Sequence, residues 1–170
     1  MDDEDDGQDS RAPTLEDLAR VCDSLNRSEA QYILIGGFAV IAHGAGRTTK
    51  DIDFLIDPSP ENVARVKTAL RVLPDNAGAL IADTDVETYK VVRVADEVVI
   101  DLMGSACGVS YQDAAKDAEV LEIERVKVPV ASKQTLIRTK ETIRPSDQMD
   151  RSFLAALIRE EEDTERRSRR

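Results

Sequence analysis

The chain has 170 residues, of which 41% are hydrophobic, enough for one domain with its own core but hardly for two. Its formal net charge is −11, yet the first ten residues, MDDEDDGQDS, hold six acids and no base. The remainder is therefore only moderately acidic, which argues against a nonspecific nucleic-acid coat, because such a coat needs a dominant basic surface. This charge still permits an enzyme that binds one RNA through a local contact.

The sequence has no membrane or secretion features. No window reaches the roughly 18 apolar residues of a membrane-spanning helix, and the acidic N-terminus has neither the basic nor the apolar part of a signal peptide. Cys22 and Cys107 lack the spacing of a metal site or of a disulfide framework. We therefore expect a cytoplasmic protein with two small core cysteines and no membrane partner.

The charge pattern divides the chain into three segments. Residues 1–12 form an acidic tail that cannot bury enough surface to offset its ordering entropy, so we expect it to be disordered. Residues 13–162 form a single domain. Residues 163–170 form a charged C-terminal tail, which we expect to be solvated.

The first half of the domain alternates helices and strands. Thr14 is placed to cap a helix that runs to about Arg27. YILI, residues 32–35, predicts a buried strand, and the glycine pair after it leads into a short helix. Residues 50–57, KDIDFLID, predict a second strand, which a helix follows over residues 61–73.

The second half is richer in strands. Residues 86–103 predict an antiparallel hairpin with a tight turn at Ala95-Asp96, and residues 119–130 predict a shorter hairpin. Two helices close the domain, one from Ser132 to about Ile143 and one capped by Ser146. The sum is a mixed α/β (α+β) domain with flanking helices.

Three aspartates stand in segments that otherwise predict buried strands. Side chains alternate along a strand, so Asp51 and Asp53 share one face while Ile52 and Phe54 point into the opposite layer. Aspartate is depleted in strands, and two like charges on one face repel by about 1 kcal/mol in water-like surroundings. Asp101 repeats the pattern in VVIDLMG, and its carboxylate joins the other two if the two strands are neighbours.

Clustered carboxylates offer the oxygen ligands that Mg²⁺ prefers, and two such ions could hold an attacking hydroxyl and a leaving pyrophosphate in line. The alternative is that each acid faces solvent on an antiparallel sheet. Gly36 and Gly37 favour the first interpretation, because they allow close backbone approach and present free amides to a phosphate. The pair matches neither the dinucleotide fingerprint nor a Walker A loop.

Two segments of the sequence resemble a known family. GGFAVIAHGAGRTTKDIDFLID is similar to the minimal nucleotidyltransferases of the polymerase-β-like superfamily, in particular to the branch of the abortive-infection (type IV toxin–antitoxin) nucleotidyltransferase toxins. LIRTKETIRPSDQMD resembles that family's lysine helix and its R-P-x-D-x-x-D segment. The resemblance covers most of residues 31–155. It implies a nucleotidyltransferase-like mixed sheet with flanking helices.

The resemblance also implies an activity and residue roles. The enzyme would move a nucleoside monophosphate from an NTP to an acceptor hydroxyl. Asp51, Asp53 and Asp101 would bind two Mg²⁺ ions, and Asp101 would help to activate the acceptor hydroxyl. Gly36 and Gly37 would contact nucleotide phosphate.

Further cations belong to the candidate site. Arg47 could reach the nucleotide phosphates as a bidentate donor, or it could neutralise the acid cluster through an ion pair. Lys140 matches the family's triphosphate contact, the alternative being a solvent-facing helix lysine. Asp147 and Asp150 match the later family segment, but their roles stay open. Arg151 departs from the family pattern, which more usually has an apolar residue there.

The resemblance extends to partners. The acceptor would be a tRNA end or the side chain of a partner protein, in a toxin–antitoxin or phage-defence system. Because the chain lacks an obvious extra helical domain for holding RNA, acceptor binding could depend on a cognate partner protein or on a homodimer. The alternative function is a non-catalytic module on the same fold that senses nucleotide or docks a partner.

Overall fold

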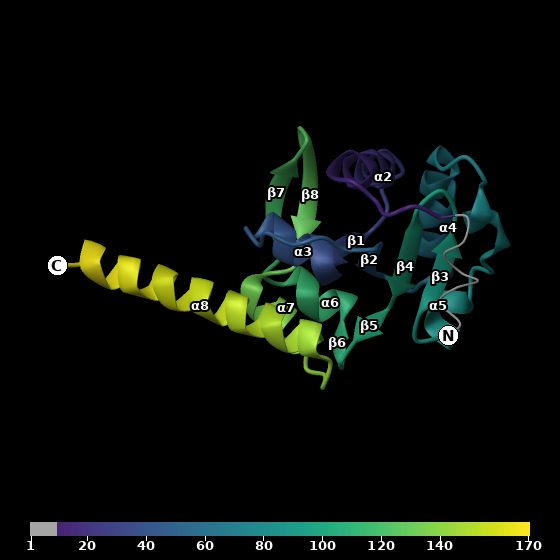
Figure 1. The fold of residues 1–170 in the computed structure, drawn as a ribbon. Helices are drawn as coiled ribbons and strands as arrows, with labels where there is room; N and C mark the ends of the chain where they lie inside the picture. Colours follow the sequence, from purple (N-terminus) through teal and green to yellow (C-terminus); the bar gives the residue numbers. More distant parts are fainter. Residues whose placement is uncertain (1–9) are drawn as a thin grey trace.

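The chain folds around a six-stranded mixed sheet with the strand order β3-β4-β2-β1-β8-β7 (Figure 1). The computed structural model describes residues 10–170. The strands of this sheet are β1 (Tyr32–Ile35), β2 (Asp51–Ile56), β3 (Val92–Ala95), β4 (Val99–Met103), β7 (Glu119–Ile123) and β8 (Val126–Val130). A separate two-stranded hairpin consists of β5 (Ser105–Ala106) and β6 (Val109–Ser110).

Helices flank the sheet (Figure 1). They are α2 (Leu15–Arg27), α3 (Gly36–Ala42), α4 (Pro60–Ala69), α5 (Asp85–Thr88), α6 (Tyr111–Ala115), α7 (Lys133–Thr139) and α8 (Pro145–Ser168). Two 3₁₀ turns, η1 (Leu70–Val72) and η2 (Ala77–Leu80), follow α4. The C-terminal part of α8 projects away from the body of the molecule. This arrangement confirms the predicted mixed α/β domain with flanking helices.

Strand β2 occupies the middle of the sheet and has an apolar and a polar face. It pairs antiparallel with β1 and parallel with β4. Ile52 and Phe54 are buried in the core, where the ring of Phe54 packs edge-on against Tyr32 with 5.3 Å between ring centroids. The predicted alternation is therefore confirmed, because the aspartates between these residues point to the other face.

Helix α2 shows how closely local sequence determines the N-terminal elements. The Thr14 hydroxyl accepts the N–H of Asp17, and the Asp17 carboxylate accepts the N–H of Thr14, which forms a capping box. The helix then buries one apolar stripe, made of Leu18, Val21, Cys22 and Leu25. The predicted cap and the predicted end at Arg27 are both confirmed.

The predicted hairpin over residues 86–103 was wrong in its first arm and in its turn. Residues Asp85–Thr88 form a helical turn, in which the Asp85 carboxylate accepts the N–H of Ala82 and the Thr88 hydroxyl donates to a carbonyl one turn earlier. The strand starts only at Val92, and the connection includes Val98, which is fully buried. This longer connection changes the pairing register of the hairpin.

The closing helices also differ from the prediction. Helix α7 ends at Thr139 and does not reach Ile143. The cap at Ser146 was wrong as well, because α8 begins at Pro145. Proline fits this first position, since its missing N–H would have no partner inside the helix. The helix continues through the charged C-terminal residues to Ser168.

The remaining sequence predictions have mixed outcomes. The acidic run falls on residues 1–9, outside the described residues, while Ser10 donates its hydroxyl to the Asp96 carbonyl at 2.6 Å.

Cys22 is buried, but Cys107 is exposed in the turn between β5 and β6, so the prediction of two core cysteines was wrong for Cys107. Within residues 10–170 none of the helices combines the length and the apolar character needed to cross a membrane.

Candidate active site

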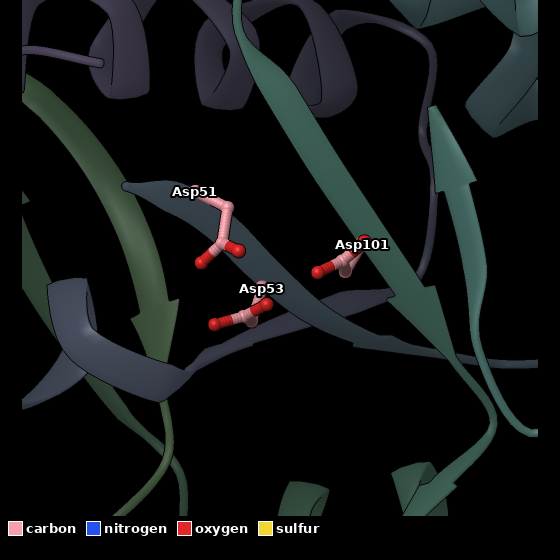
Figure 2. Close-up of side chains that lie close together, drawn as sticks. All are labelled: Asp51, Asp53 and Asp101. Carbon is pink, nitrogen blue, oxygen red and sulfur yellow. The ribbon is translucent and has the colours of Figure 1, made fainter. Parts of the chain in front are cut away.

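Three aspartates meet at the centre of the sheet (Figure 2). Asp51 and Asp53 lie on β2, and β4 runs parallel beside it with Asp101 directly opposite Asp53. One carboxylate oxygen from each residue lies within 4.8 Å of the other two. The predicted convergence of the three carboxylates is therefore confirmed, and the strand order that it required is present.

The cluster is electrostatically unfavourable in its charged form. Loss of solvent and the neighbouring charges of Asp51 and Asp101 raise the pKa of Asp53 to about 8. Burial, and then the charge of Asp101, also raises the pKa of Asp51. Such a site gains most from added positive charge, because each cation relieves both the repulsion and the desolvation of the carboxylates.

The glycine turn leads the chain past these acids. Gly36 has a φ of 72°, in the left-handed region, and a Cβ built there would lie 2.1 Å from an Asp53 carboxylate oxygen. A Cβ on Gly37 would lie 2.6 Å from the Thr49 hydroxyl. Both glycines are therefore required by close packing around Asp53 and Thr49. They also start α3 directly, whereas the sequence predicted that the helix begins after them.

A second group of charges lies across the cleft, at the junction of α7 and α8. The Lys140 ammonium lies 3.0 Å from Asp150 and 3.6 Å from Asp147. The Arg47 guanidinium lies 2.5 Å from Asp150. Lys140 is buried, which rules out the alternative of a solvent-facing helix lysine. The alternative that Arg47 pairs with the triad was also wrong, because its carboxylate partner here is Asp150.

Hydrogen bonds from the α7–α8 connection complete this group. The Thr142 hydroxyl donates to Asp147 at 2.6 Å, and Arg144 contacts the same carboxylate at 2.9 Å. Burial alone would raise the pKa of Asp147, but the Thr142 hydroxyl and the charges of Lys140 and Arg144 lower it overall. Arg151 donates to the carbonyls of Lys140 and Thr142, which accounts for a cation where the family pattern usually has an apolar residue.

Sequence reasoning missed Arg93, on strand β3. Its guanidinium donates to both carboxylate oxygens of Asp101, from Nε at 2.9 Å and from Nη2 at 3.0 Å. The same Nη2 lies 3.4 Å from a carboxylate oxygen of Asp51. Only the correct register of the hairpin places Arg93 opposite Asp101. A tight turn at Ala95-Asp96 would have paired Arg93 with a residue nearer the turn.

The triad, the glycine turn, Arg93 and the charged groups around Lys140 line one cleft of about 430 Å³. Its lining includes every residue that the sequence suggested for the site: Gly36, Gly37, Arg47, Asp51, Asp53, Asp101 and Lys140. Arg93 and Arg144 also line it. The cleft therefore combines a carboxylate cluster with cationic groups on the opposite wall, which suits a metal-bound polyphosphate.

The triad fits a divalent metal by its own chemistry. It supplies only hard oxygen donors, close enough together to share an ion. Burial and the neighbouring carboxylates raise the pKa of Asp53 and of Asp51, so a cation would favour their charged forms. The geometry defines a cleft suited to nucleotide chemistry at a glycine turn.

The fold is that of a nucleotidyltransferase. The chain is similar to a crystal structure from Thermotoga maritima described as a "putative nucleotidyltransferase", with a TM-score of 0.52 and 15% sequence identity over 88% of this chain and 92% of that chain. A comparison with curated proteins gives no match.

A family model identifies the branch. The model described as "Nucleotidyl transferase AbiEii toxin, Type IV TA system" matches residues 18–144. The chain therefore belongs to the AbiEii nucleotidyltransferase toxin family, and the resemblance found in the sequence is confirmed. As a member, it is a transferase that moves nucleoside monophosphates, and the family implies an NTP substrate and a cognate antitoxin.

Proposed function

We propose that this protein transfers a nucleoside monophosphate from an NTP to an acceptor hydroxyl in a Mg²⁺-dependent reaction. The convergence of three carboxylates within 4.8 Å beside a glycine turn carries the proposal. Asp51, Asp53 and Asp101 would hold two Mg²⁺ ions. Bound there, the ions would stabilise the charge that develops on the attacking and leaving oxygens.

The residues around the triad would bind and orient the nucleotide. Gly36 and Gly37, which line the cleft, would contact the nucleotide phosphate through their backbone. Burial and the acidic neighbours raise the pKa of Asp53, and the charge of Lys140 opposes this rise, so the ammonium interacts with the triad across the cleft. We assign it, together with Arg47, to the triphosphate, to which both would turn from the carboxylate of Asp150.

The chemical step forms a bond between the acceptor oxygen and the α-phosphorus and breaks the bond to the β-phosphate oxygen. Pyrophosphate leaves. Asp101, at the β4 side of the triad, would polarise the acceptor hydroxyl and favour loss of its proton. Positioning and charge compensation supply most of the catalysis in this scheme.

The acceptor would be a tRNA end or a hydroxyl side chain of a protein, within a toxin–antitoxin or phage-defence system. Family membership supports this setting. The alternative, a non-catalytic module that senses nucleotide, would also need the cleft. The full triad is the observation against it, because a sensor has no need for three mutually repelling carboxylates in one strand pair.

The test is transfer of label. Purified protein is incubated with Mg²⁺ and each α-labelled NTP in turn, with RNA and protein fractions supplied separately. The matched control is Asp51→Asn/Asp53→Asn, which removes charge and changes little volume. If one fraction is labelled by the wild-type protein but not by the control, the labelled fraction identifies the acceptor class and the NTP used identifies the nucleotide. Equal labelling by the control would contradict the proposal, and nucleotide binding without pyrophosphate release would favour the sensor.

A further inference from the structure

Arg93 occupies the position where a cation would bind to the triad. It extends from β3, the edge strand, and lies directly opposite Asp101 in the antiparallel pairing with β4. Its two contacts to Asp101, at 2.9 and 3.0 Å, form a bidentate pair that uses both carboxylate oxygens. A third contact, at 3.4 Å, reaches Asp51. One guanidinium thus joins two of the three acids.

The two partners differ in their access to solvent. The Asp101 side chain is 8% exposed, whereas the Arg93 side chain is 39% exposed. A long, half-exposed side chain on an edge strand can rotate into water without disturbing the sheet, while the carboxylate is fixed by its strand. The arginine is therefore the partner through which solvent reaches this pair.

A divalent ion and Arg93 need the same oxygens. Both are cations, and they repel each other strongly at the short distances that shared carboxylates would impose. Arg93 also differs from Lys140, whose ammonium pairs with Asp147 and Asp150 across the cleft. A metal at the triad would leave the pairs of Lys140 intact, but it would compete directly with Arg93.

We propose that Arg93 is an internal counter-cation that competes with the divalent metal for Asp101 and Asp51. Before the metal binds, it compensates the charge of the triad and stabilises the folded protein. Metal loading requires its release into the cleft, so Arg93 sets the metal concentration at which the site fills. This inference rests on the proposed function, because it takes the triad to be the metal site.

A structural role for Arg93 predicts the opposite behaviour. If the guanidinium held Asp101 in its ligating orientation, its removal would loosen the site and weaken metal binding. The direction of the change in affinity therefore separates competition from support.

The experiment measures Mn²⁺ affinity by electron paramagnetic resonance on the full chain. The variants are Arg93→Gln, which removes the charge, and Arg93→Lys, which keeps it. Arg27→Gln is the matched control, since Arg27 forms an exposed ion pair with Asp23 on α2. Asp53→Asn tests the site itself. We expect about tenfold tighter binding in Arg93→Gln, and little change in Arg93→Lys and in Arg27→Gln, as competition between two cations predicts.

The outcomes distinguish a failure of the proposed role of Arg93 from a failure of the proposed metal site. Weaker or unchanged Mn²⁺ binding in Arg93→Gln, with Asp53→Asn binding poorly, would overturn the role of Arg93 and leave the metal site standing. Wild-type binding that Asp53→Asn does not reduce would overturn the metal site and, with it, this inference. A thermal melt provides a second readout. With EDTA, Arg93→Gln should melt below wild type, and Mg²⁺ should raise its midpoint by more than that of wild type.

Discussion

The cleft holds two groups of aspartates with opposite electrostatic character. Asp51, Asp53 and Asp101 come from adjacent strands, and burial together with the charges of Asp51 and Asp101 raises the pKa of Asp53 to about 8. Asp147 and Asp150 come from one helix and are surrounded by Lys140, Arg47 and Arg144. The pKa of Asp147 is lowered in consequence.

The contrast indicates different tasks for the same residue type. The α8 pair is compensated by the protein itself, and its contacts with Arg47 and Lys140 join the α3–β2 loop and the end of α7 to α8. The triad is compensated only in part, by Arg93 at Asp101 and Asp51, and the charged form of Asp53 is costly because of burial and of its acidic neighbours. We therefore expect substitution of Asp53 to remove activity and spare stability, and substitutions in the α8 pair to reduce stability directly.

The largest effect is expected for Asp53→Asn. Transfer activity should fall by about a thousandfold or more, because the central carboxylate of the proposed metal site is lost. The free energy of unfolding should stay within about 1 kcal/mol of wild type or rise, since a like-charge repulsion is removed. Labelled transfer and urea unfolding measure the two quantities. A large loss of stability would show that the triad is structural.

The second effect concerns Asp150→Ala. This change leaves Lys140 and Arg47 without their shared carboxylate in a poorly solvated site, so we expect a loss of about 3 kcal/mol in unfolding free energy. Urea unfolding measures it. The control is Asp83→Ala, which breaks an exposed pair with Lys67 and should cost about 0–1 kcal/mol. Similar losses in both variants would mean that the α8 pair contributes no special stability.

The glycine turn connects both groups and offers a third test. In Gly36→Ala the new Cβ would collide with the Asp53 carboxylate, and φ is positive there, so we expect about 1–3 kcal/mol of destabilisation and weaker Mn²⁺ binding. Gly46→Ala is the control, because nothing lies within 4 Å of its Cβ position. Unchanged Mn²⁺ binding in Gly36→Ala would contradict the close packing of this turn on the triad.

The smallest effect concerns the second glycine. A serine at position 37 would place its Cβ 2.6 Å from the Thr49 hydroxyl. Gly37→Ser should therefore destabilise the protein, and the added change Thr49→Ala should restore about 1 kcal/mol. A double-mutant cycle by urea unfolding gives this coupling. Additive effects of the two substitutions would mean that the contact with Thr49 is not the reason why position 37 requires glycine.

Much of the triad was predictable because strand alternation is a local property. It places Asp51 and Asp53 on one face without any knowledge of the rest of the chain. Including Asp101 in the triad required the strand order. The sequence predicted that Asp101 would join the other two acids only if its strand lay beside theirs. With β4 parallel to β2 and Asp101 in register with Asp53, the three acids meet.

Arg93 and the charge pairs across the cleft were less predictable. The partner of Arg93 depends on hairpin register, and the longer connection around Val98 shifts that register relative to a tight turn. The pairing of Arg47 with Asp150 joins residues 103 positions apart, which no local pattern indicates. It depends on how the α3–β2 loop, which carries Arg47, packs against α8.

The most direct measurement is a crystal structure with Mn²⁺ and a non-hydrolysable NTP analogue. The account predicts anomalous density for Mn²⁺ in contact with Asp51, Asp53 and Asp101, with the triphosphate between this site and Lys140. It also predicts that Arg93 has left Asp101. Nucleotide and Mn²⁺ bound elsewhere, with the Arg93–Asp101 pair intact and the triad empty, would contradict the central claim.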